Sequence, residues 1–194
     1  MKEHSIKTNF LSCDWKELPE KEQTLVQLAK QMTQHSYSPY SKFSVGAALL
    51  LKDGTIVKGS NQENAAYPSG LCAERTALFS ANSNYPEQPV VALAIACYTD
   101  GHFLSTPGSP CGACRQVMIE TEYRYGEPMR VILYGEDKTL VFHSAADLLP
   151  SEEHLAELII AEKECTYMRE YIFQDNRVVE IDFDKIYLDD KESI

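Results

Sequence analysis

The stretches CAER at residues 72–75 and PCGAC at residues 110–114 decide the fold, because together they carry three cysteines that one metal ion can gather. Cys111 and Cys114 can face one ion at the start of a helix, and Cys72 can reach it from the start of another. The partial positive charge at a helix N-terminus also favours thiolates. Three thiolates leave one position of a tetrahedral zinc ion open, which separates a catalytic zinc from a structural one. The sequence therefore predicts a catalytic zinc site between two helices.

Glu74 and Arg75 follow the first of these cysteines and supply the charges that such a site needs. A carboxylate beside the metal can take a proton from water, pass it to a substrate ring and then protonate a departing amine, because it cycles between base and acid. Three thiolates and one Zn²⁺ sum to a negative charge, which weakens the effect of the metal on water. Arg75 can offset part of this charge by donating to a cysteine sulfur. We expect Glu74 to be the catalytic residue and Arg75 to tune the zinc centre.

A purely structural role for the cysteines is the competing interpretation. A structural zinc site normally has four protein ligands, so the fourth would have to be Cys13, Cys97, Cys165 or a histidine. Cys97 ends an apolar run at residues 90–97 and is predicted to pack in the core. A disulfide is disfavoured, because the polar start of the chain is unlike a signal peptide and the cytoplasm keeps thiols reduced.

The charge of the chain is negative and uneven, which restricts its partners. The 194 residues carry a net charge of −11, and residues 151–194 contribute −8 of it. An acidic chain without a basic stripe binds phosphate backbones poorly, so nucleic acid is an unfavourable substrate and a small neutral molecule is compatible. No run of about 18 apolar residues is present, so no membrane span is expected. These features fit a cytoplasmic protein that acts on a small molecule.

Hydrophobic periodicity and turn residues predict helices alternating with strands. Helices are expected at residues 19–37, 71–81, 111–122 and 145–149, and strands at residues 43–51, 55–59, 90–97, 129–134 and 139–143. This order predicts an α/β fold in which a sheet lies between helical layers.

The chain is expected to have three parts. Residues 1–17 form an N-terminal extension, residues 18–150 the catalytic domain, and residues 151–194 an acidic C-terminal extension that packs on the domain or on a neighbouring subunit. Within the last part, residues 152–173 are predicted to be helical and residues 178–186 to form a strand.

Longer motifs surround the cysteines: SYSPYSKFSVGAALL at residues 36–50, GSNQENAAYPSGLCAERTAL at residues 59–78 and SPCGACRQV at residues 109–117. In this order they resemble the homo-oligomeric, tetrameric-type zinc-dependent cytidine deaminases, over roughly residues 18–150. The resemblance implies a three-layer αβα sandwich with a mixed five-stranded sheet and one Zn²⁺ per subunit. It also implies a homo-oligomer, either a tetramer or a dimer, whose pockets are shared between subunits. It implies hydrolytic deamination of cytidine and deoxycytidine to uridine and deoxyuridine, with release of ammonia, in pyrimidine salvage.

The same resemblance implies roles for individual positions. Cys72, Cys111 and Cys114 match the zinc ligands, and Glu74 matches the proton shuttle. The implied substrate contacts are Phe43 against the pyrimidine, Asn61 and Glu63 on the ribose hydroxyls, the backbone of Ala73, Ser109 and Pro110 on the base, and Tyr67 in a neighbouring subunit's site.

Simpler interpretations of the substrate contacts stay open. Phe43 begins an apolar strand and could pack in the core, while Asn61 and Glu63 could be ordinary turn residues. Tyr67 could be a surface residue of a loop. The chain also departs from the family at Ser44, where a proline often follows the stacking aromatic residue.

Other functions are compatible with the same motifs. The zinc chemistry could act on a modified cytosine nucleoside, a nucleoside antibiotic or a free base, and the domain could also be a catalytically inactive zinc scaffold. Asn61 and Glu63 favour a nucleoside, since a free base has no ribose to bind. Glu74 argues against the scaffold, because such a protein has no need of an acid beside the metal.

Overall fold

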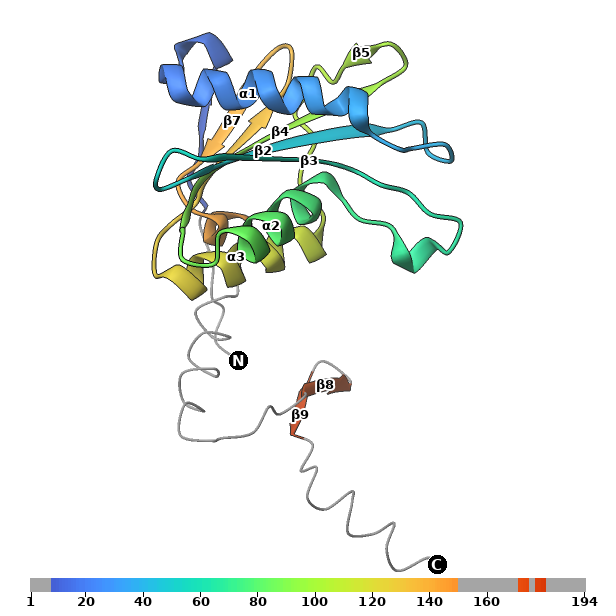
Figure 1. Ribbon diagram of the computed structural model, residues 1–194, viewed down its shortest axis with the longest axis vertical. Coiled ribbons are helices and arrows are strands. Elements are labelled where there is room, and N and C mark those ends of the chain that lie inside the picture. The colour runs from blue at the N-terminus through green and yellow to red at the C-terminus, as the bar shows by residue number, and fades with distance from the viewer. Residues whose placement is uncertain (1–7, 150–170, 175–176, 181–194) are drawn as a thin grey trace, which may run out of the picture. The chain divides into compact units, whose positions relative to one another are not determined.

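The computed structural model describes residues 8–149, 171–174 and 177–180, and a mixed sheet lies at the centre of residues 8–149 (Figure 1). Its strands are β1 (Leu11–Cys13), β2 (Ser44–Leu51), β3 (Ile56–Ser60), β4 (Val90–Thr99), β5 (His102–Phe103), β6 (Arg130–Tyr134) and β7 (Thr139–Phe142). The strand order is β1-β7-β6-β4-β2-β3, and β5 pairs with β4 off this path. The β4–β6 pair is parallel and the remaining pairs of this sheet are antiparallel.

Helices cover the sheet on both faces. Helix α1 (Glu20–Met32) lies on one face, and α2 (Ala73–Asn84) and α3 (Gly112–Tyr125) lie on the other (Figure 1). Short 3-10 helices occur at η1 (Trp15–Glu17), η2 (Thr33–His35), η3 (Tyr67–Ser69) and η4 (Ala145–Leu148). The predicted helix at residues 19–37 therefore divides into α1 and η2, and the short one at residues 145–149 is a 3-10 turn. The three-layer sandwich predicted from the sequence is confirmed.

Strand β4 shows why the apolar run at residues 90–97 is buried on both sides. Successive side chains of a strand point to opposite faces of the sheet. Ala92, Ala94 and Ala96 pack in the cluster that contains α1 residues, and Leu93, Ile95 and Cys97 pack in the cluster that contains α2 and α3 residues. Small side chains toward one layer and mostly larger ones toward the other fill both cores from a single strand.

The sheet carries two strands more than the five that the resemblance implies. Strand β1 pairs with β7 and adds residues of the N-terminal segment to the sheet edge. Strand β5 forms because Asp100 and Gly101 both adopt positive φ angles, 52° and 84°, which fold the chain back in a tight hairpin. Neither strand shows enough apolar alternation in sequence to be predicted.

The chain divides into two compact units, Met1–Glu152 and Glu153–Ile194. In the second unit, β8 (Tyr171–Gln174) pairs antiparallel with β9 (Arg177–Glu180). The helix predicted at residues 152–173 is wrong at residues 171–173, where β8 lies, and its remainder lies outside the described residues. The predicted strand at residues 178–186 is confirmed over residues 178–180.

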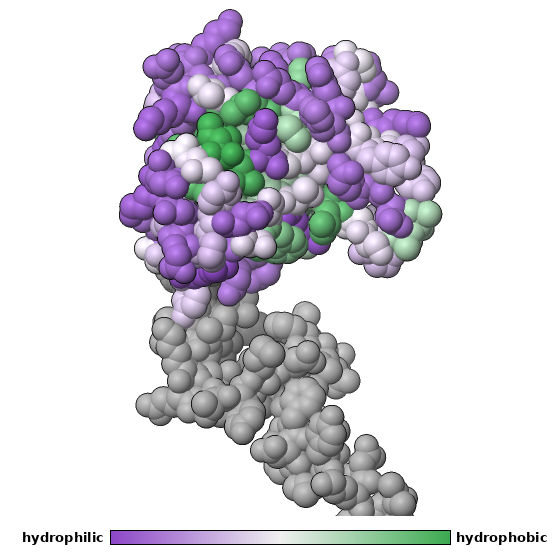
Figure 2. All heavy atoms as spheres, viewed as in Figure 1, coloured by the Kyte–Doolittle hydropathy of each residue, from purple (hydrophilic) through white to green (hydrophobic). Residues whose placement is uncertain are grey.

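The visible surface of the described residues is mostly hydrophilic, with a smaller apolar area among the polar side chains (Figure 2). Among residues 8–149, the large apolar or aromatic residue with the highest exposure is Tyr67, at 91%. None of the helices in this part of the chain has the length and apolar character needed to cross a bilayer.

Gly59 on β3 sets the distance between the sheet and α2. A Cβ atom at this position would lie 2.6 Å from the Ala73 carbonyl oxygen and 2.7 Å from the Ala77 nitrogen, both backbone atoms that cannot move without shifting the helix. Gly59→Ala should therefore lower the free energy of unfolding by roughly 2–3 kcal/mol, measured by urea denaturation.

Gly112→Ala is the matched control for this change, because no atom lies within 4 Å of a Cβ built there. We expect it to change the free energy of unfolding by no more than about 0.5 kcal/mol. Equal stability of the two variants would show that β3 and α2 are not held at this distance.

Candidate active site

Three cysteine sulfurs meet where α2 and α3 begin. Cys72 and Cys111 are the N-cap residues of the two helices, and Cys114 lies in the first turn of α3. The three Sγ atoms lie within 4.8 Å of one another, with Cys111 Sγ 3.8 Å from Cys72 Sγ and 3.4 Å from Cys114 Sγ. Because the helices pack side by side and start at the same end, residues far apart in sequence form one cluster (Figure 1).

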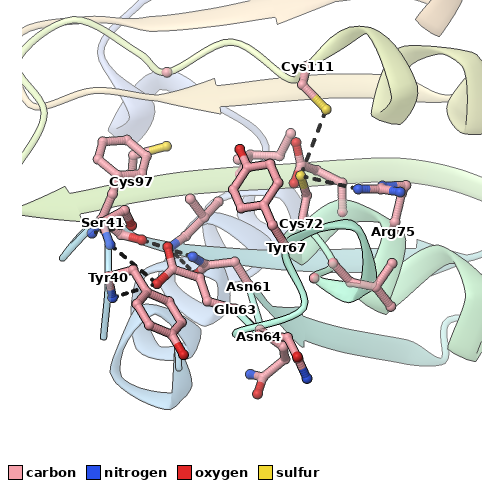
Figure 3. Close-up of a pocket in the computed structure, with 18 of the residues that line it drawn as sticks. Tyr40, Ser41, Asn61, Glu63, Asn64, Tyr67, Cys72, Arg75, Cys97 and Cys111 are labelled. Atoms are coloured by element: carbon pink, nitrogen blue, oxygen red, sulfur yellow. Dashed lines mark hydrogen bonds between the residues drawn. The ribbon is translucent and has the colours of Figure 1, made fainter. Parts of the chain in front are cut away.

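The cluster has the electrostatics of a metal site. Hydrogen bonding by Cys114, supported by the Arg75 guanidinium and by Cys111, lowers the pKa of Cys72 to about 5. The Arg75 Nη2 atom lies 3.7 Å from Cys72 Sγ (Figure 3). The hydrogen bond to Cys72 and burial raise the pKa of Cys114. A cation can replace the thiol protons of the cluster, since metal ligation requires the thiolate.

Zinc fits this donor set. Ligands 2.3 Å from a tetrahedral zinc ion lie about 3.8 Å apart, close to the sulfur separations in the cluster. Among the residues that the structure describes, no fourth cysteine or histidine joins the group. The cysteines in this part of the chain are free thiols and form no disulfide with one another. Cys165 lies outside the described residues. Three protein ligands are typical of catalytic rather than structural zinc.

Glu74 lies beside the cysteines in the first turn of α2 and is 4% exposed. Burial raises the pKa of the Glu74 carboxyl to about 7, and the negative charge on Cys72 adds to this effect. A group with a pKa near neutrality can both accept and release a proton during a reaction.

A cavity of about 1120 Å³ opens over this cluster. Of the predicted site residues, Phe43, Asn61, Glu63, Tyr67, Cys72, Glu74, Arg75, Ser109 and Cys111 line it. Ala73, Pro110 and Cys114 are buried and do not line the cavity. Cys97, which the sequence predicts to be a core residue, is buried in the core and also lines the cavity. A single cavity thus contains both the metal-binding thiols and polar side chains able to bind a substrate.

Asn61 and Glu63 hold the loop at the cavity mouth. The Asn61 Oδ1 atom accepts from the Val45 N–H at 2.7 Å, and Asn61 Nδ2 donates to the Phe43 carbonyl oxygen at 2.9 Å. Glu63 Oε2 accepts from the backbone N–H groups of Tyr40 and Ser41 (Figure 3). Hydrogen bonding from Ser41 and from these N–H groups lowers the pKa of Glu63. Both side chains are more than turn residues, because each fixes a second segment.

The structure adds Arg115, which the sequence did not single out. Its guanidinium donates to the Pro110 carbonyl oxygen at 2.9 Å, to Ser109 Oγ at 2.8 Å and to the Leu148 carbonyl oxygen at 2.8 Å. Arg115 therefore holds the loop that leads into Cys111 against the end of the first unit. Its position directly after a cysteine in SPCGACRQV was the available signal, but the acceptors become visible only in the fold.

A zinc-thiolate cavity of this kind on a three-layer αβα sandwich defines a zinc-dependent hydrolase of the deaminase class. Residues 19–125 match the family described as the cytidine and deoxycytidylate deaminase zinc-binding region, and the chain belongs to this family.

Individual relatives agree with this assignment. The chain is 51% identical over 98 residues to cytidine deaminase of Halalkalibacterium halodurans, covering 50% of this chain and 70% of the relative. It is 44% identical over 111 residues to cytidine deaminase of Mycobacterium tuberculosis, covering 56% and 79%. The crystal structure of cytidine deaminase from Burkholderia pseudomallei superposes with a TM-score of 0.57 at 43% identity, covering 66% of this chain and 96% of that one. Zinc is therefore the metal of this site.

Proposed function

We propose that the chain catalyses the hydrolytic deamination of cytidine and deoxycytidine to uridine and deoxyuridine, with release of ammonia. The observation that carries this proposal is the buried Glu74 beside three clustered cysteine sulfurs, in the cavity that also contains Asn61 and Glu63. The similarity to cytidine deaminases over the same residues supports the choice of substrate.

Cys72, Cys111 and Cys114 would hold the zinc ion. When bound, zinc supplies a Lewis acid that makes water nucleophilic near neutral pH. Arg75 donates toward Cys72 and reduces the excess negative charge of three thiolates. This assignment uses all three sulfurs of the cluster and leaves Cys97 as a lining residue.

Glu74 would move the protons of the reaction. It accepts a proton from the water that attacks C4 of the cytosine ring, and it delivers this proton to the ring nitrogen. It then passes the second proton of that water to the amino group, which leaves as ammonia, so that the oxygen of water becomes the new carbonyl oxygen. Burial suits Glu74 to this cycle, because its pKa of about 7 allows it to act as base and as acid.

The remaining lining residues would bind the nucleoside. Phe43 would pack against the pyrimidine, and Asn61 and Glu63 would bind the sugar hydroxyls. The backbone of Ala73 would donate to the base carbonyl, and the backbone around Ser109 and Pro110 would accept from the amino group. Three hydrogen bonds from Arg115 support the last role, since they fix the loop that carries the acceptors.

We extend the proposal to assembly and location. Tyr67, on η3 beside the cavity, is 91% exposed, and such an aromatic side chain suits a contact with the site of a neighbouring subunit in a homo-oligomer of tetrameric type. Residues 18–150 would be the catalytic domain between an N-terminal extension, residues 1–17, and the acidic extension, residues 151–194. Free cysteines suit a cytoplasmic location.

The test is the ultraviolet absorbance of cytidine and deoxycytidine incubated with the zinc-loaded protein. We expect the cytosine band to disappear for both nucleosides, with one ammonia released for each nucleoside consumed. Free cytosine is the control and should react far more slowly, because it offers nothing to Asn61 and Glu63. Intact cytidine after incubation with folded, zinc-loaded protein would refute the proposed substrate.

A further inference from the structure

We propose that Ser36 is a positioning residue for sugar recognition: its hydroxyl fixes Asn61 as a hydrogen-bond donor toward the cavity, so that the site selects a sugar hydroxyl. The inference rests on the proposed function, because it concerns how the same cavity chooses its substrate. Ser36 does not line the cavity and acts through Asn61.

Backbone pairing brings Ser36 to Asn61. The segment around Tyr37 runs beside the segment around Gln62 as an isolated parallel bridge. The Tyr37 N–H donates to the Asn61 carbonyl oxygen at 3.0 Å, and the Glu63 N–H donates to the Tyr37 carbonyl oxygen at 2.8 Å. These two bonds place the Ser36 hydroxyl oxygen 2.6 Å from Asn61 Oδ1.

The backbone also determines which way the Asn61 amide points. The Val45 N–H can only donate, so the side-chain atom 2.7 Å from it is the amide oxygen. The Phe43 carbonyl oxygen can only accept, so the atom 2.9 Å from it is the amide nitrogen. A flipped amide would place donor against donor and acceptor against acceptor.

A chain of serine hydroxyls ends on this amide oxygen. Ser36 Oγ lies 3.2 Å from Ser38 Oγ, which lies 3.3 Å from Ser44 Oγ. Because Ser36 has one hydroxyl proton and Asn61 Oδ1 can only accept, that proton lies in the contact with Asn61. The contact of Ser36 Oγ with Asn61 Oδ1 is also the shorter of the two contacts open to this proton, 2.6 Å against 3.2 Å to Ser38 Oγ.

The result is a pair of side chains complementary to a hydroxyl group. Asn61 Oδ1 accepts from Val45 and Ser36, which uses both of its lone pairs and leaves one Nδ2 proton available. Glu63 is ionised at neutral pH and can only accept, and the two N–H groups that it binds both contact its Oε2 atom. A hydroxyl can accept from Asn61 and donate to Glu63 at once, whereas an ether or a phosphate oxygen cannot.

Removing the Ser36 hydroxyl should therefore weaken sugar recognition specifically. In Ser36→Ala the Asn61 oxygen keeps the Val45 N–H but loses its second donor, so it can accept a hydrogen bond from the cavity. The two backbone bonds still prevent a flip of the amide, but they alone now restrain it, and the N–H is offered to the sugar less precisely. We expect kcat/KM for cytidine to fall about fivefold, the loss expected for one hydrogen bond. For dideoxycytidine, which lacks both secondary hydroxyls of the sugar, kcat/KM should change less than about twofold.

The decisive experiment compares Ser36→Thr with Ser36→Val, a pair that differs in the hydroxyl but keeps the same branched shape. Ser36 has φ −64° and ψ 137°, an extended conformation that suits both residues. Threonine should keep the wild-type preference for cytidine over dideoxycytidine, and valine should lose it as alanine does. The exposed Ser83, changed to alanine, is the control and should leave both substrates unaffected.

Binding of uridine and dideoxyuridine by titration calorimetry separates this inference from the proposed function. Equal losses for both nucleosides in Ser36→Ala and Ser36→Val, or no loss in either variant, would overturn the role of Ser36. A wild-type protein that deaminates nothing, yet binds uridine better than dideoxyuridine through Ser36, would refute the proposed function and leave this inference standing.

Discussion

Glu74→Gln is expected to lower kcat for cytidine by roughly 10³- to 10⁴-fold while leaving one zinc ion in each chain. Glutamine has nearly the shape of glutamate but cannot take up a proton, so the water, the ring and the leaving amine all lose their proton carrier. The cysteine cluster does not depend on Glu74 for its geometry, because both cysteine-bearing helix starts are set by packing against the sheet. The measurement is steady-state turnover of cytidine together with zinc content by atomic emission.

Glu120→Gln is the matched control, since Glu120 is exposed on α3 and lines no part of the cavity. It should keep wild-type turnover. Turnover by Glu74→Gln within tenfold of the wild type would remove Glu74 from the proton path and leave the cavity without the acid–base group that the reaction needs.

Cys72→Ala is expected to reduce the zinc content from about one ion to less than about a tenth of an ion per chain, and to lower kcat by more than about 10³-fold. Cys72 is the ligand from α2, so its loss leaves two ligands, both from the start of α3. Two thiolates separated by one helical turn do not complete a tetrahedral site. Zinc content after dialysis and turnover of cytidine report the two effects independently.

Cys13→Ala provides the control, because Cys13 is a free thiol on β1 and is not part of the cluster. Its zinc content and turnover should match the wild type. A full zinc ion in Cys72→Ala would mean that the metal is held by a different set of residues.

Much of the fold could be predicted because the decisive elements have strong local patterns. The run at residues 90–97 is apolar at every position and forms a strand covered on both faces. The two cysteine motifs lie where helices begin, and α2 and α3 start at Ala73 and Gly112. Residues 171–173 are apolar or aromatic at consecutive positions, a pattern compatible with a buried helix as well as with a strand. The sequence therefore predicts a helix where the structure has β8.

The two added strands were not predicted from the sequence, for different reasons. Strand β1 has three residues and becomes a strand only because the edge of β7 is available to pair with it. Strand β5 differs, because the Asp100-Gly101 turn that makes its hairpin is a known signal in sequence; the strand was missed because only two residues follow it.

The cysteine cluster and the buried Glu74 beside it are predictable because zinc chemistry demands particular residue types at particular spacings. Arg115 and Ser36 act instead through backbone acceptors and through another side chain, at positions where many residue types would be equally plausible in sequence. Only the three-dimensional arrangement shows that the arginine after the last cysteine donates to the preceding loop, and that a serine hydroxyl lies against the Asn61 amide oxygen.

The central claim, that the chain hydrolyses the C4–amine bond of a cytosine nucleoside, is tested most directly by reaction in water enriched in oxygen-18. The account predicts that uridine gains a single labelled oxygen, at C4, and that an equal amount of ammonia appears. Uridine without the label, or labelled uridine formed at the same rate by Glu74→Gln, would contradict it.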